Sequence, residues 1–123
     1  MADYIPVFKP GTDVTFTAGA AITGGRLVAL SAAETVIETS ATTAAWMGAA
    51  VQDAASGAMV GVTSGGVQEL IVNAAVAVGD ILVPAANGRV TPIAAGTNYA
   101  HVVGIATTAQ STAGQTCRVK MAR

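Results

Sequence analysis

The stretch VGDILVPAANGRVTPI, residues 78–93, decides the fold class. It is typical of a strand, a tight turn and a returning strand, because Asn87 and Gly88 tolerate the positive φ angles that a two-residue hairpin turn demands. The earlier stretch GGRLVALSAAETVIET, residues 24–39, has the same layout of an apolar run, a small-residue turn and a Val-containing return. The chain therefore predicts β-hairpins at two places along its length.

The likeness between these two stretches continues downstream. Residues 46–62 align with residues 101–119, and each segment passes through an Ala/Ser/Gly turn into a Val-rich strand. The offset between the matched positions drifts slightly, as insertions in loops would cause. We interpret the pattern as a weak internal pseudo-repeat, roughly residues 22–72 and 76–121. The matched positions are Gly25 with Gly79, Val36 with Val90, and Gly48 with Gly104.

The composition is unusually poor in charge. Of 123 residues, 52% are hydrophobic and only 11% are charged, against about 25% charged in an average soluble domain. The length suits one domain. Neutral Thr, Ser, Ala and Gly must cover much of the surface, which leaves room for part of it to be buried against other chains.

The net charge of -1 gives no electrostatic footprint for a polyanion, so we expect no direct contact with nucleic acid. A membrane span is not expected either, because polar residues and Pro84 interrupt the most apolar window, residues 70–86. The N-terminus lacks the basic-then-apolar layout of a signal peptide. We expect synthesis in a cytoplasm.

The residue types favour strands over helices. Val and Ile are abundant while Leu is rare, and Gly and Pro cut the chain into short pieces with turn signals about every ten residues. The predicted fold class is all-β: one compact β-barrel or β-sandwich-like domain of the β-tulip type over residues 14–123. Short helical turns would fit residues 40–45 and 93–100. The predicted strands are residues 14–17, 26–30, 36–38, 46–50, 58–63, 67–72, 81–83, 90–91, 101–107 and 116–121.

Residues 1–13 differ in kind and predict an extended N-terminal arm. Large apolar residues stand beside prolines, which cannot donate a backbone hydrogen bond to a central sheet. Burying each such side chain contributes about 1.5–3 kcal/mol, so the arm should dock somewhere. The sequence leaves open whether it docks on its own domain or on a partner. The arm residues in question are Tyr4, Ile5, Pro6, Val7 and Phe8.

Candidate catalytic and metal-binding residues are too few to make a site. His101 is the only histidine, and no Ser or Cys near it in sequence marks itself as a nucleophile. His101 and Cys117 fall short of the four ligands of a structural zinc site. We expect Cys117 to be buried and unreactive. The chain is not expected to be an enzyme or to hold a metal or a cofactor.

The carboxylates fit exposed turn or edge positions better than a catalytic pair. No lysine follows the glycine-rich run of a phosphate-binding loop, and the aromatic residues are too few for a base-stacking platform. What is left is a nearly charge-free β domain with an apolar arm, which is typical of a subunit in a larger assembly. The carboxylates considered are Glu34, Glu38, Asp53, Glu69 and Asp80.

Almost the whole chain resembles the small capsid decoration, or cement, proteins of phages. The resemblance rests on the order and spacing of five segments more than on any one of them. These are YIPVFKPGTDVTFTA (4–18), AAITGGRLVAL (20–30), AWMGAAVQDAASGAMVGV (45–62), GGVQELIVNAAVAVGDILVPAANGRVTPI (65–93) and HVVGIATTAQSTAGQTCRVKM (101–121).

This resemblance implies a β-rich subunit made in a bacterial host and located on the virion exterior. Such a subunit forms homotrimers and bridges neighbouring copies of the major capsid protein. It also implies that the N-terminal arm reaches the shell, which gives Tyr4, Ile5, Pro6, Val7 and Phe8 the role of capsid contact. The alternative is a small-ligand or carbohydrate-binding β-barrel, for which Tyr4, Trp46 and Tyr99 are the candidate aromatic platforms.

Overall fold

The computed structural model describes residues 13–123, so the predicted arm, apart from Asp13, lies outside the described residues. The predicted all-β class is confirmed, and helix is confined to two single 3₁₀ turns. The first five strands are β1 (Val14–Ala18), β2 (Leu27–Ala32), β3 (Thr35–Glu38), β4 (Trp46–Ala50) and β5 (Met59–Thr63). The rest are β6 (Val67–Ile71), β7 (Ile81–Ala85), η1 (Ala86–Gly88), β8 (Arg89–Pro92), η2 (Tyr99–His101), β9 (Gly104–Ala106) and β10 (Thr116–Met121).

Every predicted strand overlaps an observed one, and β4 and β10 have the predicted bounds. The largest departure is at residues 101–107, where β9 is shorter and His101 lies in η2 instead of opening a strand. The cause is local. The side chain of Asn98 accepts a hydrogen bond from the Ala100 amide at 2.8 Å, which fixes a turn where the apolar pattern alone predicted extended chain.

The turn at Asn87-Gly88 is a hairpin turn, but the predicted two-residue loop is wrong. Ala85 pairs with Arg89, so three residues connect β7 to β8. Both Asn87 and Gly88 have the expected positive φ, at 60° and 66°. The Gly88 amide donates to the Thr39 carbonyl at 2.9 Å. This bond to a distant segment accommodates the additional residue.

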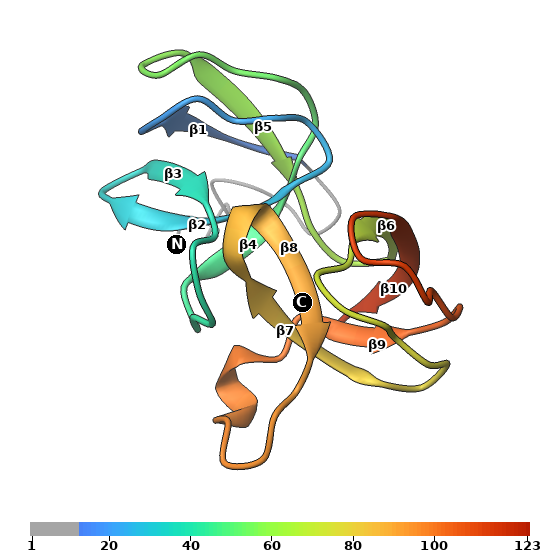
Figure 1. The fold of residues 1–123 in the computed structure, drawn as a ribbon. Coiled ribbons are helices and arrows are strands. Elements are labelled where there is room, and N and C mark those ends of the chain that lie inside the picture. Colours follow the sequence, from blue (N-terminus) through green and yellow to red (C-terminus); the bar gives the residue numbers. More distant parts are fainter. Residues whose placement is uncertain (1–12) are drawn as a thin grey trace, which may run out of the picture.

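Strands β1–β5 form a closed barrel in the order β1-β3-β2-β4-β5 (Figure 1). β1 closes it by pairing antiparallel with β5 on one side and parallel with β3 on the other. The β1–β3 contact is short and involves only Thr17 and Ala18 of β1. Among residues 13–123, the first half of β1 therefore has a pairing partner on the β5 side alone.

Strands β6–β10 form a second sheet in the order β6-β10-β9-β7-β8. If β6 is matched with β1, β7 with β2 and so on, this is the same circular order of neighbours as in the barrel, read in the opposite direction. The parallel contact between β1 and β3 has its counterpart in a bridge between Val72, just after β6, and Val90 of β8. The boundary between the barrel strands and the strands of the second sheet lies between β5 and β6, at residues 64–66. The sequence pattern instead divides the chain at residues 72–76. The pseudo-repeats as units of domain organisation stay a prediction.

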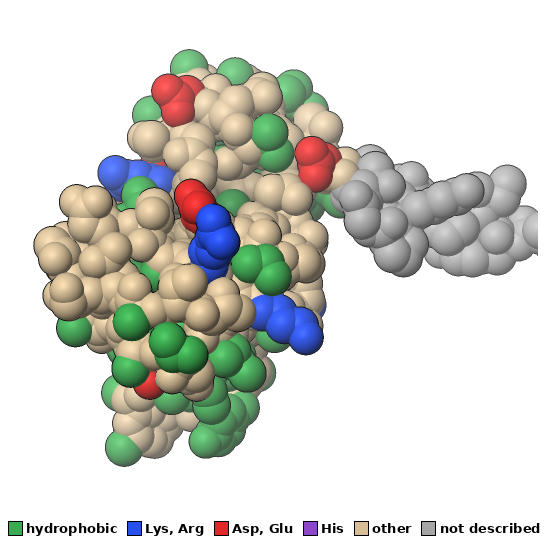
Figure 2. Space-filling model, turned by 90° about the vertical axis from the view of Figure 1, so that its right-hand side faces the viewer, with side chains coloured by type: hydrophobic (Ala, Val, Ile, Leu, Met, Phe, Trp, Pro, Cys, Tyr) green, Lys and Arg blue, Asp and Glu red, His purple; other side chains and the backbone are tan. Residues whose placement is uncertain are grey.

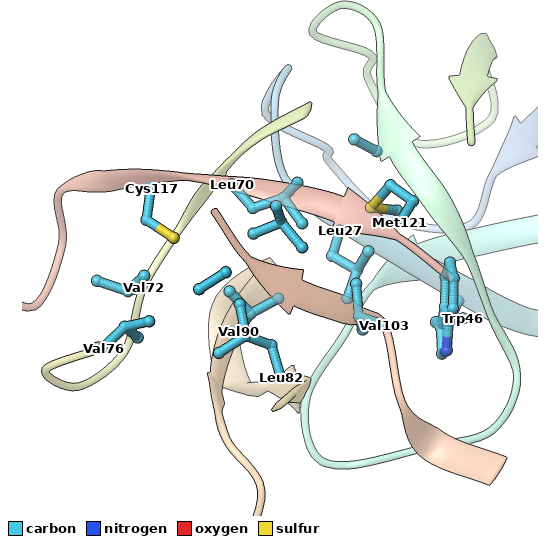
Figure 3. Close-up of a cluster of buried hydrophobic side chains, with 14 residues drawn as sticks. Leu27, Trp46, Leu70, Val72, Val76, Leu82, Val90, Val103, Cys117 and Met121 are labelled. Carbon is cyan, nitrogen blue, oxygen red and sulfur yellow. The ribbon is translucent and has the colours of Figure 1, made fainter. Parts of the chain in front are cut away.

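Two clusters of buried side chains form the core. The first fills the closed barrel and includes Phe16, Val28 and Val36. The second joins the two halves, because Leu27 and Trp46 from the first half pack among side chains of β6–β10 (Figure 3). Trp46 is 1% exposed and Cys117 is 2% exposed, so both residues lie in the core as expected.

Polar contacts also join the halves. The buried Thr39 hydroxyl donates to the Ala85 carbonyl at 2.8 Å, and Arg26 Nη1 donates to the Asn87 carbonyl at 3.0 Å. The guanidinium of Arg123 lies 4.4 Å from the centre of the Trp46 ring and also donates to the Trp46 carbonyl. The second cluster and these polar contacts thus hold the two similar halves of residues 13–123 together.

Candidate functional site

The described part of the chain contains no cluster of three or more His, Cys, Asp or Glu side chains that could hold a metal ion. His101 is half-buried in η2, and Cys117 points inward from β10. Burial raises the pKa of the Cys117 thiol, while a hydrogen bond with Thr108 lowers it. A thiol in this position is a poor nucleophile at neutral pH, because the reactive species is the thiolate.

Three of the carboxylates accept hydrogen bonds from backbone amides in loops. Glu38 accepts a hydrogen bond from the Thr23 amide at 2.8 Å, and Asp53 accepts one from the Gly24 amide at 2.7 Å. Asp80 likewise accepts from the Ala77 amide at 2.9 Å. Glu38 and Asp80 are half-buried, so the prediction that all the carboxylates are exposed is wrong for these two. Fixing backbone amides in turns is a structural role.

A groove of about 260 Å³ lies beside β3 and the loop that follows it. Its lining combines small residues with Leu30 and Ile37. Among the described residues, the only ionisable side chain in the lining is Glu38, which already pairs with Arg26 at 3.4 Å. Of the aromatic candidates within residues 13–123, Trp46 is buried and Tyr99 is absent from the groove's lining. The groove therefore offers no aromatic platform for a sugar.

The surface is sparsely charged and carries isolated apolar side chains. Figure 2 shows one face, on which a few charged groups, including a red and a blue one in contact near the centre, are scattered over a mostly neutral surface. Within residues 13–123, no helix has the length and hydropathy needed to span a membrane. A surface of this kind suits contact with another neutral protein surface better than recognition of an ionic ligand. The large apolar residues that are exposed are Leu30, Val51, Met59, Val67, Val78, Tyr99 and Ile105.

A mainly apolar open groove of about 430 Å³ lies at one end of the closed barrel, and we call it the first-barrel mouth. Phe16 at its base belongs to the barrel core, while Val14 and Met47 pack on that core and are half-buried. Leu30, at the rim, is 41% exposed. Residues 13–123 therefore cover the barrel interior incompletely at this end. The mouth is lined by Val14, Phe16, Leu30, Ala32, Ala33, Glu34 and Met47.

The equivalent end of the second half is covered. Pro84 is the counterpart of Leu30, because Pro84 pairs with Val90 in the second half and Leu30 pairs with Val36 in the first. Unlike Leu30, Pro84 is buried. Val103, which precedes Gly104 as Met47 precedes Gly48, is 0% exposed. It belongs to the cluster that side chains of the first half complete (Figure 3). The two halves share a pairing order but differ in that only the second has this end closed by residues 13–123.

The arm joins the body at the mouth. Val14 is both a lining residue and the first residue of β1, so residues 1–12 lead directly to the rim. The predicted contact residues Tyr4, Ile5, Pro6, Val7 and Phe8 lie outside the described residues, and the structure places none of them. Sequence reasoning missed the mouth. No local signal marks it, because Leu30 lies in the ordinary strand run LVALSA and pairs with Val36 of β3.

Comparison with known proteins supplies a family and a fold. A family model described as phage cement protein matches residues 8–121. Among solved structures, the head fiber gp8.5 N base of bacteriophage phi29 superposes with a TM-score of 0.73 at 21% sequence identity, covering 90% of this chain and 93% of that one. No curated protein matches the chain. The phi29 likeness is one of fold.

Proposed function

Since the chain belongs to the phage cement protein family, we propose that it binds the outer surface of an icosahedral phage capsid and stabilises the shell by bridging major capsid proteins. The observation that carries the proposal is the extent of the family match, which covers residues 8–121 and thus both halves of the fold. The chain is a capsid-associated structural protein of a phage, and the finer proposal concerns how it attaches.

The described surface supports attachment to protein. Interfaces are depleted in charge at their centres, and this chain has 11% charged residues with a net charge of -1. Exposed side chains such as Leu30 and Met59 add apolar contact area. Neutral, partly apolar faces can pack against a shell without the desolvation cost of buried charges.

The arm is the proposed contact with the major capsid protein. Tyr4, Ile5, Val7 and Phe8 supply large apolar side chains, and Pro6 holds part of the backbone extended. Such a segment can add a strand to an exposed sheet edge or lie in an apolar groove of the partner. No activity as an enzyme is part of the proposal.

A homotrimer would multiply this contact. Three arms on one body act at high effective concentration, so that modest individual contacts give tight attachment. Closed rotational symmetry is the usual form of a small homo-oligomer, and a three-fold body fits three-fold positions of an icosahedral shell. A subunit that binds the mature shell and not its alternatives stabilises that shell by mass action.

Co-sedimentation with purified capsids that lack this protein tests the proposal. We expect the intact protein to band with capsids and to raise their resistance to heat. The variant Ile5→Ser, Val7→Ser, Phe8→Ser should stay folded by circular dichroism and fail to band, while the control Tyr99→Ser should band fully.

Full occupancy by the arm variant would reject the arm as the contact. Absence of the intact protein from the particles would reject capsid attachment as a whole. Sedimentation equilibrium of the free protein checks the trimer independently of either result.

A further inference from the structure

At the first-barrel mouth, residues 13–123 leave one end of a hydrophobic core incompletely covered. Its volume of about 430 Å³ would hold on the order of ten waters against mainly apolar walls. Val14 and Met47 are only half-buried there, although they pack on the cluster that fills the barrel. Removing such apolar surface from water is favourable by about 25 cal/mol per Å², so the mouth is a docking surface for an apolar segment.

A segment of the right chemistry is attached to its rim. Residues 4–8, YIPVF, are all apolar or aromatic, and residues 9–13 connect them to β1. A connection of this length reaches about 17 Å when extended. It contains Pro10-Gly11, a pair that favours a chain reversal. The arm can therefore turn back over the end of the barrel from which it emerges.

We infer that, in the free subunit, residues 4–8 of the same chain dock in the first-barrel mouth and complete the barrel core. The mouth has two further features that suit this occupant. The ladder between β1 and β3 includes only Thr17 and Ala18 of β1, so no other strand of residues 13–123 pairs with the backbone of Val14–Phe16 on that side. Glu34 stands at the rim, where Lys9 would follow the docked segment.

The tether decides between the chain's own arm and the arm of a second copy. A short flexible linker holds its segment at an effective concentration in the millimolar range. A copy outside the same oligomer, at micromolar concentration, competes poorly with that. The parallel with the second half also supports closure within one chain, because the end marked by Pro84 and Val103 is closed by residues of the same chain.

This inference concerns the free subunit and does not rest on capsid attachment. If the arm also contacts the shell, attachment exchanges one apolar partner for another. The free energy gained on the capsid is then the difference between burying the arm against the shell and burying it in the mouth. It is smaller than the free energy of burying an arm that was fully exposed to water.

A disulfide trap tests the docking. In a Cys117→Val background, Val7→Cys is combined with Leu30→Cys at the rim of the mouth. The matched control combines Val7→Cys with Tyr99→Cys, which is 72% exposed. The loop that contains residue 99, drawn in orange in Figure 1, lies at the opposite end of the molecule from β1 and β3. We expect an intrachain bond to form about tenfold faster with position 30 than with position 99 under dilute oxidation.

Equal rates for the two pairs would overturn docking in the mouth, and a bond between two chains at position 30 would assign the mouth to a second copy. A dye assay makes the test independent of the engineered cysteines. Deleting residues 2–10 should increase the fluorescence of the hydrophobic probe ANS, and a peptide of residues 1–12 should reverse the increase.

Leu30→Asp added to the deletion variant should prevent that reversal by the peptide, whereas Val78→Asp, at another exposed apolar position, should not. An ANS signal that is indifferent to the deletion would refute the inference. Neither assay contains capsids, so its failure is distinguishable from failure of the proposed function.

Discussion

Gly48 and Gly104 hold the same place in the two halves of the protein. Gly48 pairs with Val28 of β2, and Gly104 pairs with Leu82 of β7. A Cβ atom at either position would collide with a backbone carbonyl of the following strand, that of Thr63 at Gly48 and that of Lys120 at Gly104. Close approach of two backbones therefore requires glycine at both positions.

Replacing either glycine by alanine should destabilise the fold. Because the obstructing atoms belong to the backbone, the strands must move apart, and we expect a loss of about 1–3 kcal/mol in the free energy of unfolding for Gly48→Ala and for Gly104→Ala. Urea denaturation measures it. Gly61→Ala in β5 is the control, since its Cβ would meet only Val51 at an ordinary 3.6 Å. Equal stability of all three variants would refute the steric account.

Thr39→Val should weaken the junction between the halves. The Thr39 side chain is 2% exposed and its hydroxyl donates to the Ala85 carbonyl, so valine leaves a buried acceptor without this partner at a cost of about 1–3 kcal/mol. The control is Thr35→Val, whose hydroxyl bonds the nearby Ala33 carbonyl in an exposed position. Thermal unfolding of the two variants compares them. A Thr39 variant as stable as the control would show that the bond contributes nothing.

Arg123→Ala should lower stability modestly. The guanidinium stacks on Trp46 and donates to the carbonyls of Ala44 and Trp46, and a cation–π contact at an exposed site is worth about 0.5–1 kcal/mol. Lys120→Ala on the solvent face of β10 is the matched control and should stay within about 0.5 kcal/mol of the parent. Trp46 fluorescence gives a second measurement, because only the Arg123 variant changes the surroundings of the ring.

Cys117 should make stability fall at alkaline pH. Burial raises the pKa of its thiol above the ordinary value of 9.0, so in alkali the unfolded chain loses this proton before the folded chain does. The stabilising contribution is complete below the unfolded-state pKa and disappears as pH rises through the folded-state pKa. Urea midpoints across this range should fall more steeply for the parent than for Cys117→Val, which has no thiol. Parallel curves would contradict the prediction.

The positions of the strands follow from the sequence because their signals are local. Short Val- and Ile-rich runs between turn residues predict all ten strands, and glycine with positive φ stands where turns are expected, at Gly25 and Gly79. The pairing order was not predictable in this way. Closing β1 against both β3 and β5 depends on contacts between distant segments, which no single run of residues encodes.

The features that sequence reasoning missed arise from tertiary contacts. The three-residue loop at Ala86–Gly88 depends on a bond to Thr39, and the half-buried state of Glu38 depends on Arg26 and the Thr23 amide. The mouth escaped notice because Leu30 reads as an ordinary strand residue. Its exposure is evident only from what fails to pack on it within residues 13–123.

The loop between the two halves lies beside both ends of the described segment. Val14 pairs with Val62 just before this loop, and within it the Gly65 amide donates to the Arg123 carbonyl at 3.1 Å. A chain opened at residues 64–66, with a short glycine-serine linker joining residue 123 to residue 13, would keep every strand pairing. Circular permutation at this loop would thus exchange the order of the two halves in the chain. A foreign peptide could be inserted at the same loop without disturbing either cluster of buried side chains.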